Sequence, residues 1–145
     1  MIAVDTNILV YAHRADGPHH DAATDALQSL TAAGAHWVVP WPCIHEFLAI
    51  VTHPKVFGPP TPVEQALHAA ADLLALEGMR PAGESTDYFD VLRRVVLDSR
   101  VVGPKVHDAR IAAICLAHGV SELWTADRDF SYFPRLQTRN PLIER

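Results

Sequence analysis

Cysteine is scarce in this 145-residue sequence, which contains only two. Cys43 and Cys115 lie far apart and outside any CxxC or Cys/His spacing, so neither is expected to bind a metal ion. Two cysteines also cannot form a disulfide framework, and so low a cysteine content fits a reducing compartment. Because Cys115 stands in an apolar helical stripe, we interpret it as a buried structural thiol, and we assign no function to Cys43.

Long apolar stretches and targeting segments are also absent. The longest apolar runs, such as residues 111–117, are far shorter than the roughly 20 residues needed to cross a bilayer. The opening residues MIAVDTN lack the basic region and cleavage site of a secretory signal. The composition, 49% hydrophobic and 20% charged, is that of a globular chain. We therefore expect one soluble cytoplasmic domain over residues 1–145, with no membrane contact.

Basic residues are few in the first half of the chain. The net charge of −5 argues against a protein that binds nucleic acid through Lys and Arg alone. Residues 1–79 hold two basic and eight acidic side chains, whereas residues 80–145 hold ten basic and nine acidic ones. Three of those nine acids are Asp108, Asp127 and Asp129. A cation bound to them would leave a phosphate-facing surface, although an ordinary solvated face explains the charges equally well.

Short apolar runs alternate with helical patterns along the chain. Strands are predicted at 2–5, 37–40 and 122–125, with weaker candidates at 79–83 and 136–142. Helices are predicted at 7–12, 19–33, 63–78, 85–101 and 107–119, with another after Pro42 that carries Ile44, Phe47, Leu48 and Val51. Thr61 and Gly78 are expected to mark the two ends of helix 63–78, and Ser85 or Thr86 to cap the next helix.

This alternation predicts an α/β fold. The predicted strands are short continuous apolar runs, which is typical of a parallel sheet covered on both faces, so we expect a three-layer α/β/α sandwich. In such sheets ligands bind beyond the carboxyl ends of the strands. Asp5 and Asp127 stand at two such ends.

Four acidic residues from distant parts of the chain are candidates for one site. Asp5 ends the first strand, Glu46 lies on the helix after the second, Asp108 begins helix 107–119 and Asp127 follows strand 122–125. The aspartates also have ordinary explanations, because Asp is a favoured helix cap and stabilises helix N-termini.

Glu46 is the hardest of the four to explain without a cation. It lies beside Ile44 and Phe47, near the margin of a stripe that should face the core. No Lys or Arg occurs between residues 15 and 54. A bound metal ion, or an arginine from the second half of the chain, is therefore expected to be its partner.

Grouped carboxylates predict a hard divalent metal ion. Several of them cannot all stay ionised at close range without a cation, so removing the metal should leave at least one protonated at neutral pH. Oxygen ligands favour Mg²⁺ or Mn²⁺ over zinc. Such a site suits hydrolysis of a phosphodiester bond, in which the metal polarises the phosphoryl oxygen and activates water.

Competing motifs are incomplete. His45 and Glu46 begin an HExxH pattern, but residue 49 is Ala and the second histidine of a zinc site is missing. The VDTN segment lacks the second carboxylate of an aspartyl-phosphate-forming phosphatase, because residue 7 is Asn. The nine histidines are scattered without ligand spacing, and no glycine-rich phosphate loop is present.

Four segments resemble PIN-domain proteins and, among them, VapC-type toxins of toxin–antitoxin pairs: residues 4–12, 42–54, 106–120 and 125–130. The resemblance implies a Mg²⁺- or Mn²⁺-dependent ribonuclease with a parallel sheet in the order 3-2-1-4-5. It also implies that Asp5, Glu46, Asp108 and Asp127 are the catalytic and metal-binding acids.

Further implications of the resemblance concern supporting residues and partners. Thr6, Asn7 and Thr125 are expected to support the acids, whereas Asp129 either binds a second ion or caps a turn. The family also implies a homodimer and inhibition by a VapB-type antitoxin whose tail occupies the active-site groove. A non-catalytic PIN-like module that binds RNA or protein is the alternative, and a structure-specific DNA nuclease fits less well with so short a chain.

Overall fold

A five-stranded parallel sheet forms the centre of the computed structural model, which describes residues 1–143. The strand order is β3-β2-β1-β4-β5, which confirms the predicted order. Ala3 of β1 pairs with Val38 of β2 on one side and with Leu123 of β4 on the other. The strands are β1 (Ile2–Val4), β2 (Trp37–Pro40), β3 (Met79–Ala82), β4 (Glu122–Trp124) and β5 (Gln137–Arg139).

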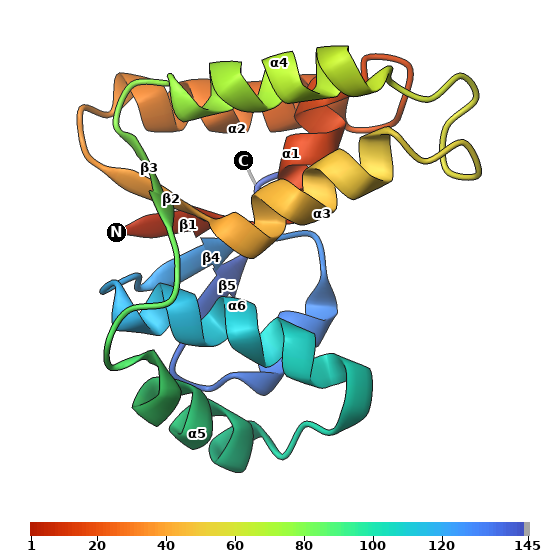
Figure 1. The fold of residues 1–145 in the computed structure, drawn as a ribbon. Coiled ribbons are helices and arrows are strands. Elements are labelled where there is room, and N and C mark those ends of the chain that lie inside the picture. The colour runs from red at the N-terminus through yellow and green to blue at the C-terminus, as the bar shows by residue number, and fades with distance from the viewer. Residues whose placement is uncertain (144–145) are drawn as a thin grey trace.

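Helices cover both faces of the sheet, as Figure 1 shows. One group, α1 to α4, packs together on one side, and α5 and α6 pack against each other on the opposite side (Figure 1). Within residues 1–143, no helix is long and apolar enough to cross a membrane. The helices are α1 (Thr6–His13), α2 (His20–Ala32), α3 (Trp41–Val51), α4 (Val63–Leu74), α5 (Tyr88–Ser99) and α6 (Val106–Ala117), with 3₁₀ turns η1 (Gly103–Lys105) and η2 (Arg128–Tyr132).

The burial of each strand explains how clearly its sequence predicted it. All four residues of β2 are buried, as are Ala3 and Val4 of β1, so these strands are continuous apolar runs. The edge strand β3 buries only Met79 and Ala82, and β5 buries none of its three residues, so the sequences of both strands are mixed. Both weak candidates are nevertheless strands, each paired in parallel with its neighbour.

Three predicted helix boundaries are wrong. Helix α4 ends at Leu74, not at Gly78, because the segment after it turns back to β2: the indole of Trp37 donates a hydrogen bond to the Glu77 carbonyl at 2.9 Å. Gly78 has a positive φ of 79°, and a Cβ there would lie 2.6 Å from the Ala35 carbonyl oxygen. Helix α5 begins at Tyr88, and no residue before it caps it with its side chain.

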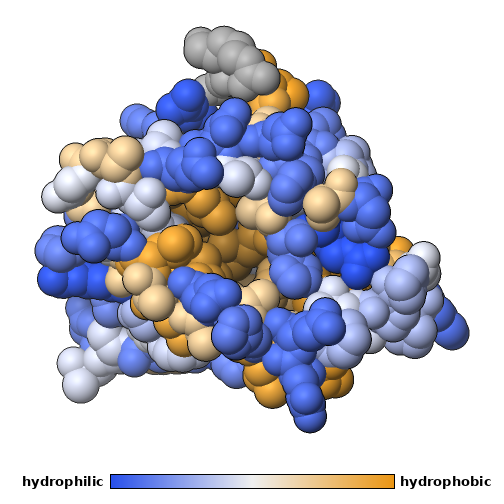
Figure 2. Space-filling model, turned by 90° about the horizontal axis from the view of Figure 1, so that it is seen from above, coloured by the Kyte–Doolittle hydropathy of each residue, from blue (hydrophilic) through white to orange (hydrophobic). Residues whose placement is uncertain are grey.

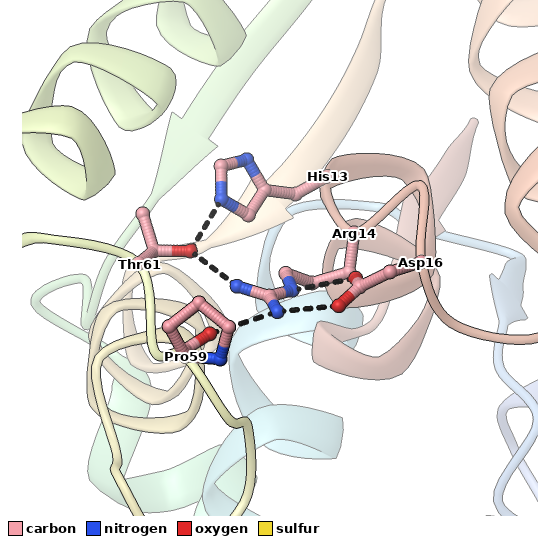
Figure 3. Close-up of polar contacts among 5 residues, drawn as sticks. All are labelled: His13, Arg14, Asp16, Pro59 and Thr61. Atoms are coloured by element: carbon pink, nitrogen blue, oxygen red, sulfur yellow. Dashed lines mark hydrogen bonds and ion pairs between the residues drawn. The ribbon is translucent and has the colours of Figure 1, made fainter.

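Thr61 anchors a loop instead of opening α4 (Figure 3). Its hydroxyl accepts a hydrogen bond from the Arg14 guanidinium at 3.2 Å and lies 3.0 Å from Nε2 of His13. The same guanidinium pairs with Asp16 at 2.7 Å and donates to the Pro59 carbonyl at 3.0 Å. These contacts fasten the proline-rich loop to the end of α1.

Candidate active site

The predicted acids lie at the carboxyl end of the sheet. Val4 of β1 pairs in parallel with Trp124 of β4, so the residues that follow these strands are neighbours. The Asp5 amide donates to the Trp124 carbonyl at 3.0 Å, and Asp127 lies three residues beyond β4. Glu46 is on α3 and Asp108 is in the first turn of α6, on the two helices next to this edge.

Asp5 is held by four hydrogen-bond donors. It is only 4% exposed. Its Oδ1 accepts from the Thr6 amide at 2.8 Å and from the Cys43 thiol at 3.5 Å, and its Oδ2 accepts from the Thr125 hydroxyl at 2.8 Å and the Asn7 amide at 3.3 Å. Asp5 therefore caps α1, which is the structural role that the sequence also allowed for it, and both of its carboxylate oxygens accept hydrogen bonds.

Burial raises the pKa of Asp5, and nearby groups change that effect in both directions. The hydrogen bonds from Thr125, Thr6 and Cys43 act to lower the pKa, whereas the charge of Asp127 raises it further. The net direction is upward, so the fold holds Asp5 in a place where its negative charge is costly.

Thr125 connects Asp5 to the loop that carries Asp127. Besides donating to Asp5, its hydroxyl accepts from the Asp127 amide at 2.9 Å. Asn7 lies 3.3 Å from the same hydroxyl and accepts from the Ala126 amide at 3.0 Å. The side chains of Thr125 and Asn7 thus fix the loop after β4 relative to Asp5.

Asp108, Asp127 and Asp129 form a separate cluster, which we call the aspartate trio. Each offers a carboxylate oxygen, and these oxygens all lie within 4.8 Å of one another. Burial raises the pKa of Asp108, as do the negative charges of Asp127, Asp129 and Glu46 in that order. Asp127 also accepts a hydrogen bond from the Asp129 amide at 2.9 Å and so caps η2. An oxygen-only set with this repulsion fits a hard divalent cation.

Glu46 lies at the margin of the buried stripe of α3, as predicted, and falls on the exposed side of that margin. The buried stripe consists of Cys43, Ile44, Phe47 and Val51 with Pro42. The Glu46 carboxylate accepts a hydrogen bond from the Thr6 hydroxyl at 3.0 Å. Protein atoms close to the carboxylate still desolvate it enough to raise its pKa, and the charge of Asp5 adds to the increase, whereas His107 and Arg110 lower it.

The four predicted acids thus fall into two groups. Asp5 and Glu46 are joined through Thr6, whereas Asp108 and Asp127 cluster with Asp129. The groups are close enough for their charges to act on each other, since Asp127 affects Asp5 and Glu46 affects Asp108.

Comparison with known proteins places the chain in a family. A family model described as "PIN domain" matches residues 2–136. Ribonuclease VapC43 of Mycobacterium tuberculosis is 33% identical over 142 residues, covering 98% of this chain and 96% of the relative. Ribonuclease VapC48 of the same organism is 31% identical over 137 residues, covering 94% of each chain. The chain belongs to the PIN-domain family, in the group of the VapC ribonucleases.

Solved structures show the same PIN-domain fold. VapBC2 from Rickettsia felis, bound to a DNA fragment from its promoter, aligns with a TM-score of 0.72 and 19% identity over 97% of this chain and 98% of the other. FitAB bound to DNA also reaches a TM-score of 0.72, with 17% identity over 100% and 98% of the two chains. At these identities the likeness concerns the fold alone.

Two residues next to the candidate site, Cys43 and Asp129, had no definite role in the sequence analysis. Cys43, to which no function was assigned, contacts Asp5 through its thiol; it lies three residues before Glu46, a spacing that puts both near one face of α3. Burial, together with the charge of Asp5, raises the pKa of the Cys43 thiol well above its ordinary value, which keeps it a neutral donor. Asp129, left open from the sequence, both belongs to the trio and donates its amide to Asp127.

Proposed function

We propose that this chain is a divalent-metal-dependent endoribonuclease and the toxin of a VapBC-type toxin–antitoxin pair. The observation that carries the proposal is the aspartate trio beside the buried carboxylate of Asp5, at the carboxyl edge of a PIN-domain sheet. The ribonuclease names of relatives that align along nearly the whole chain support RNA as the substrate.

Asp5, Glu46, Asp108 and Asp127 are the residues we propose as catalytic and metal-binding, with Asp129 completing the trio. A bound Mg²⁺ or Mn²⁺ would polarise a phosphoryl oxygen and lower the pKa of a water molecule. Asp5 has both oxygens engaged by protein donors, so it would bind an ion directly only by giving up one of them. Its main contribution is a fixed negative charge behind the trio.

Glu46 is the acid best placed to act on water. Its carboxylate is exposed and takes one hydrogen bond, from the Thr6 hydroxyl, which leaves acceptor positions free. Its raised pKa makes it a better proton acceptor than an ordinary surface glutamate. We propose that Glu46 orients the attacking water and accepts a proton from it.

A second proposed surface would bind the antitoxin. Figure 2 shows an apolar hollow on the face that carries α2 and α4. Its lining includes Leu9, Leu27, Phe47 and Leu73, one from each of α1 to α4, and Leu76, which follows α4. Exposed apolar hollows often mark protein contacts, and structural neighbours of this chain are toxin–antitoxin complexes. We propose a VapB-type antitoxin as the occupant of this hollow, so Leu27→Glu should weaken the complex of the two co-expressed proteins.

We also propose that the chain forms a homodimer, which light scattering would detect.

RNA cleavage with and without metal tests the proposed activity. The metal-free protein should be inactive, and added Mg²⁺ or Mn²⁺ should restore cleavage of RNA. Asp108→Asn should lower the rate at least about a hundredfold. Asp98→Asn is the matched control, because Asp98 is an exposed aspartate of α5 paired with Arg135 at 3.6 Å. Cleavage in EDTA at the full rate would disprove metal dependence, and RNA binding without cleavage would indicate a non-catalytic module.

A further inference from the structure

The cations around the candidate site all come from one side of it. Lys105, at the end of η1, has its Nζ 3.6 Å from Oδ2 of Asp129 and lowers the pKa of Asp108. Arg110, on α6, pairs with Glu84 at 2.9 Å and is also close enough to lower the pKa of Glu46. Arg128 stands between Asp127 and Asp129 and is exposed.

The opposite side of the site offers no comparable charge. Residues 15–54, which form α2, β2 and α3, contain no Lys or Arg. Arg14, at the end of α1, is occupied by Asp16, Thr61 and the Pro59 carbonyl (Figure 3). A polyanion that approaches the acids therefore finds compensating charge on the side of η1 and η2, where Lys105 and Arg128 lie.

An aromatic ring accompanies the nearest cation. Nζ of Lys105 lies 4.3 Å from the centre of the Tyr132 ring, which is 46% exposed. We call these two residues the Lys105–Tyr132 platform. The side chains of Lys105 and Asp129 are 43% and 53% exposed. An ion pair this exposed contributes little, so Lys105 can exchange Asp129 for another anion at small cost.

We propose that a single-stranded segment of RNA crosses the site on this side, with a backbone phosphate on Lys105 and an unpaired base stacked on Tyr132. The inference rests on the proposed ribonuclease function and adds the direction and form of the substrate. An exposed aromatic ring next to a cation is a common surface for unpaired bases. Because Nζ of Lys105 lies over the Tyr132 ring, the base stacks there once Lys105 has turned from the ring to the phosphate. Bases in a duplex are already stacked on each other, so paired RNA binds this platform more weakly.

Binding of a labelled single-stranded RNA at several salt concentrations tests the proposal. The cleavage-deficient Asp108→Asn protein serves as the parent in all variants. Lys105→Gln should reduce the slope of log affinity against log salt by about 0.7, the contribution of one phosphate contact on a single strand, and Lys105→Arg should keep the slope. Tyr132→Leu should weaken binding roughly five- to a hundredfold without changing the slope, and Tyr132→Phe should bind like the parent.

Lys55→Gln is the matched control, because Lys55 is an exposed lysine of the loop before α4 and should leave affinity and slope unchanged. A duplex of the same sequence should bind more weakly than the single strand. The proposal is overturned if Lys105→Gln and Tyr132→Leu bind like the parent, or if they lower only the melting temperature, which would mean that the platform merely joins η1 to η2. Failure of the ribonuclease proposal is a separate result, namely no metal-dependent cleavage by the unmodified chain.

Discussion

Asp5 and the aspartate trio belong to the same candidate site, yet they differ in burial and in the number of hydrogen bonds that they accept. Asp5 is buried and accepts hydrogen bonds from four donors. The trio is more exposed, and its members repel one another; its carboxylates are contacted by the Asp129 amide, which donates to Asp127, and by Lys105, whose Nζ lies 3.6 Å from Asp129. The first acid is part of the framework, whereas the trio keeps oxygen atoms free for a cation. A site can thus combine an acid that the fold needs with acids that the fold tolerates.

The largest expected effect comes from removing the framework acid. Asp5→Ala leaves the buried Thr125 hydroxyl and Thr6 amide without their acceptor, so it should lower the free energy of unfolding by about 2–4 kcal/mol. Denaturant unfolding of the metal-free protein would measure this. Asp127→Ala, which changes a trio member, is the comparison and should cost clearly less. Equal losses would remove the distinction between the two groups.

Removal of the Thr125 hydroxyl should have the next largest effect on stability. Thr125→Val keeps the shape but removes the donor to Asp5 and the acceptor for the Asp127 amide, so we expect a loss of about 1–3 kcal/mol and a fall in cleavage of about ten- to a hundredfold. Thr125→Ser retains the hydroxyl and should recover most of both. A serine variant as damaged as the valine variant would show that packing, not the hydroxyl, matters.

Replacing each of the two cysteines by serine should change the free energy of unfolding by amounts that differ by about 1 kcal/mol. In Cys43→Ser the new hydroxyl still faces Oδ1 of Asp5, whereas Cys115→Ser places a hydroxyl among apolar neighbours in α6. Cys115→Ser should therefore be the more destabilising by about 1 kcal/mol or more, as measured by chemical denaturation. If Cys43→Ser were the worse of the two, the contact between its side chain and Asp5 would have no stabilising role.

The smallest expected effect on stability is that of Asp108→Asn, which should stabilise the metal-free protein, whereas the substitutions above destabilise it. Its pKa is raised above the ordinary value of 3.8, so the folded chain binds this proton more tightly than the unfolded chain does. Stability is therefore lost as the pH rises from that ordinary value through the raised one, and the loss is complete above it. Asp108→Asn should raise the melting temperature of the metal-free protein by about 1–3 °C at pH 7.5 and by nothing near pH 4.

Excess Mg²⁺ is the control for that experiment, since a bound cation should remove the advantage of the asparagine variant. Asp5 and Glu46, whose pKa values are also raised, act in the same direction and over the same kind of pH interval. An Asp108→Asn protein that is less stable than the parent at pH 7.5 would contradict the repulsion on which the trio argument depends.

How far the sequence predicts this molecule depends on the range of the interactions involved. Continuous apolar runs predicted β1 and β2, and the parallel arrangement then placed Asp5 and Asp127 at the same edge of the sheet. These are local signals combined with one general rule about strand ends. The order of the five strands came from resemblance, because the runs themselves do not specify which strands pair.

Features set by long-range contacts were missed. Glu46 lies at the margin of the buried stripe of α3, and helical periodicity alone cannot say on which side of that margin a residue falls. Thr61 looked like the start of a helix, but its partner is Arg14, which is distant in the sequence. The position of Asp129 within the trio depends on how η2 folds back toward α6, which no periodic pattern records.

The central claim is that the trio is a divalent-cation site, and titration of the metal-free protein with Mn²⁺, followed by the loss of the free-ion electron paramagnetic resonance signal, tests it most directly. We predict saturable binding that Asp108→Asn or Asp127→Asn abolishes and that Asp98→Asn leaves unchanged. Mn²⁺ binding that is absent from the unmodified protein, or that is equally strong in all three variants, would contradict the account.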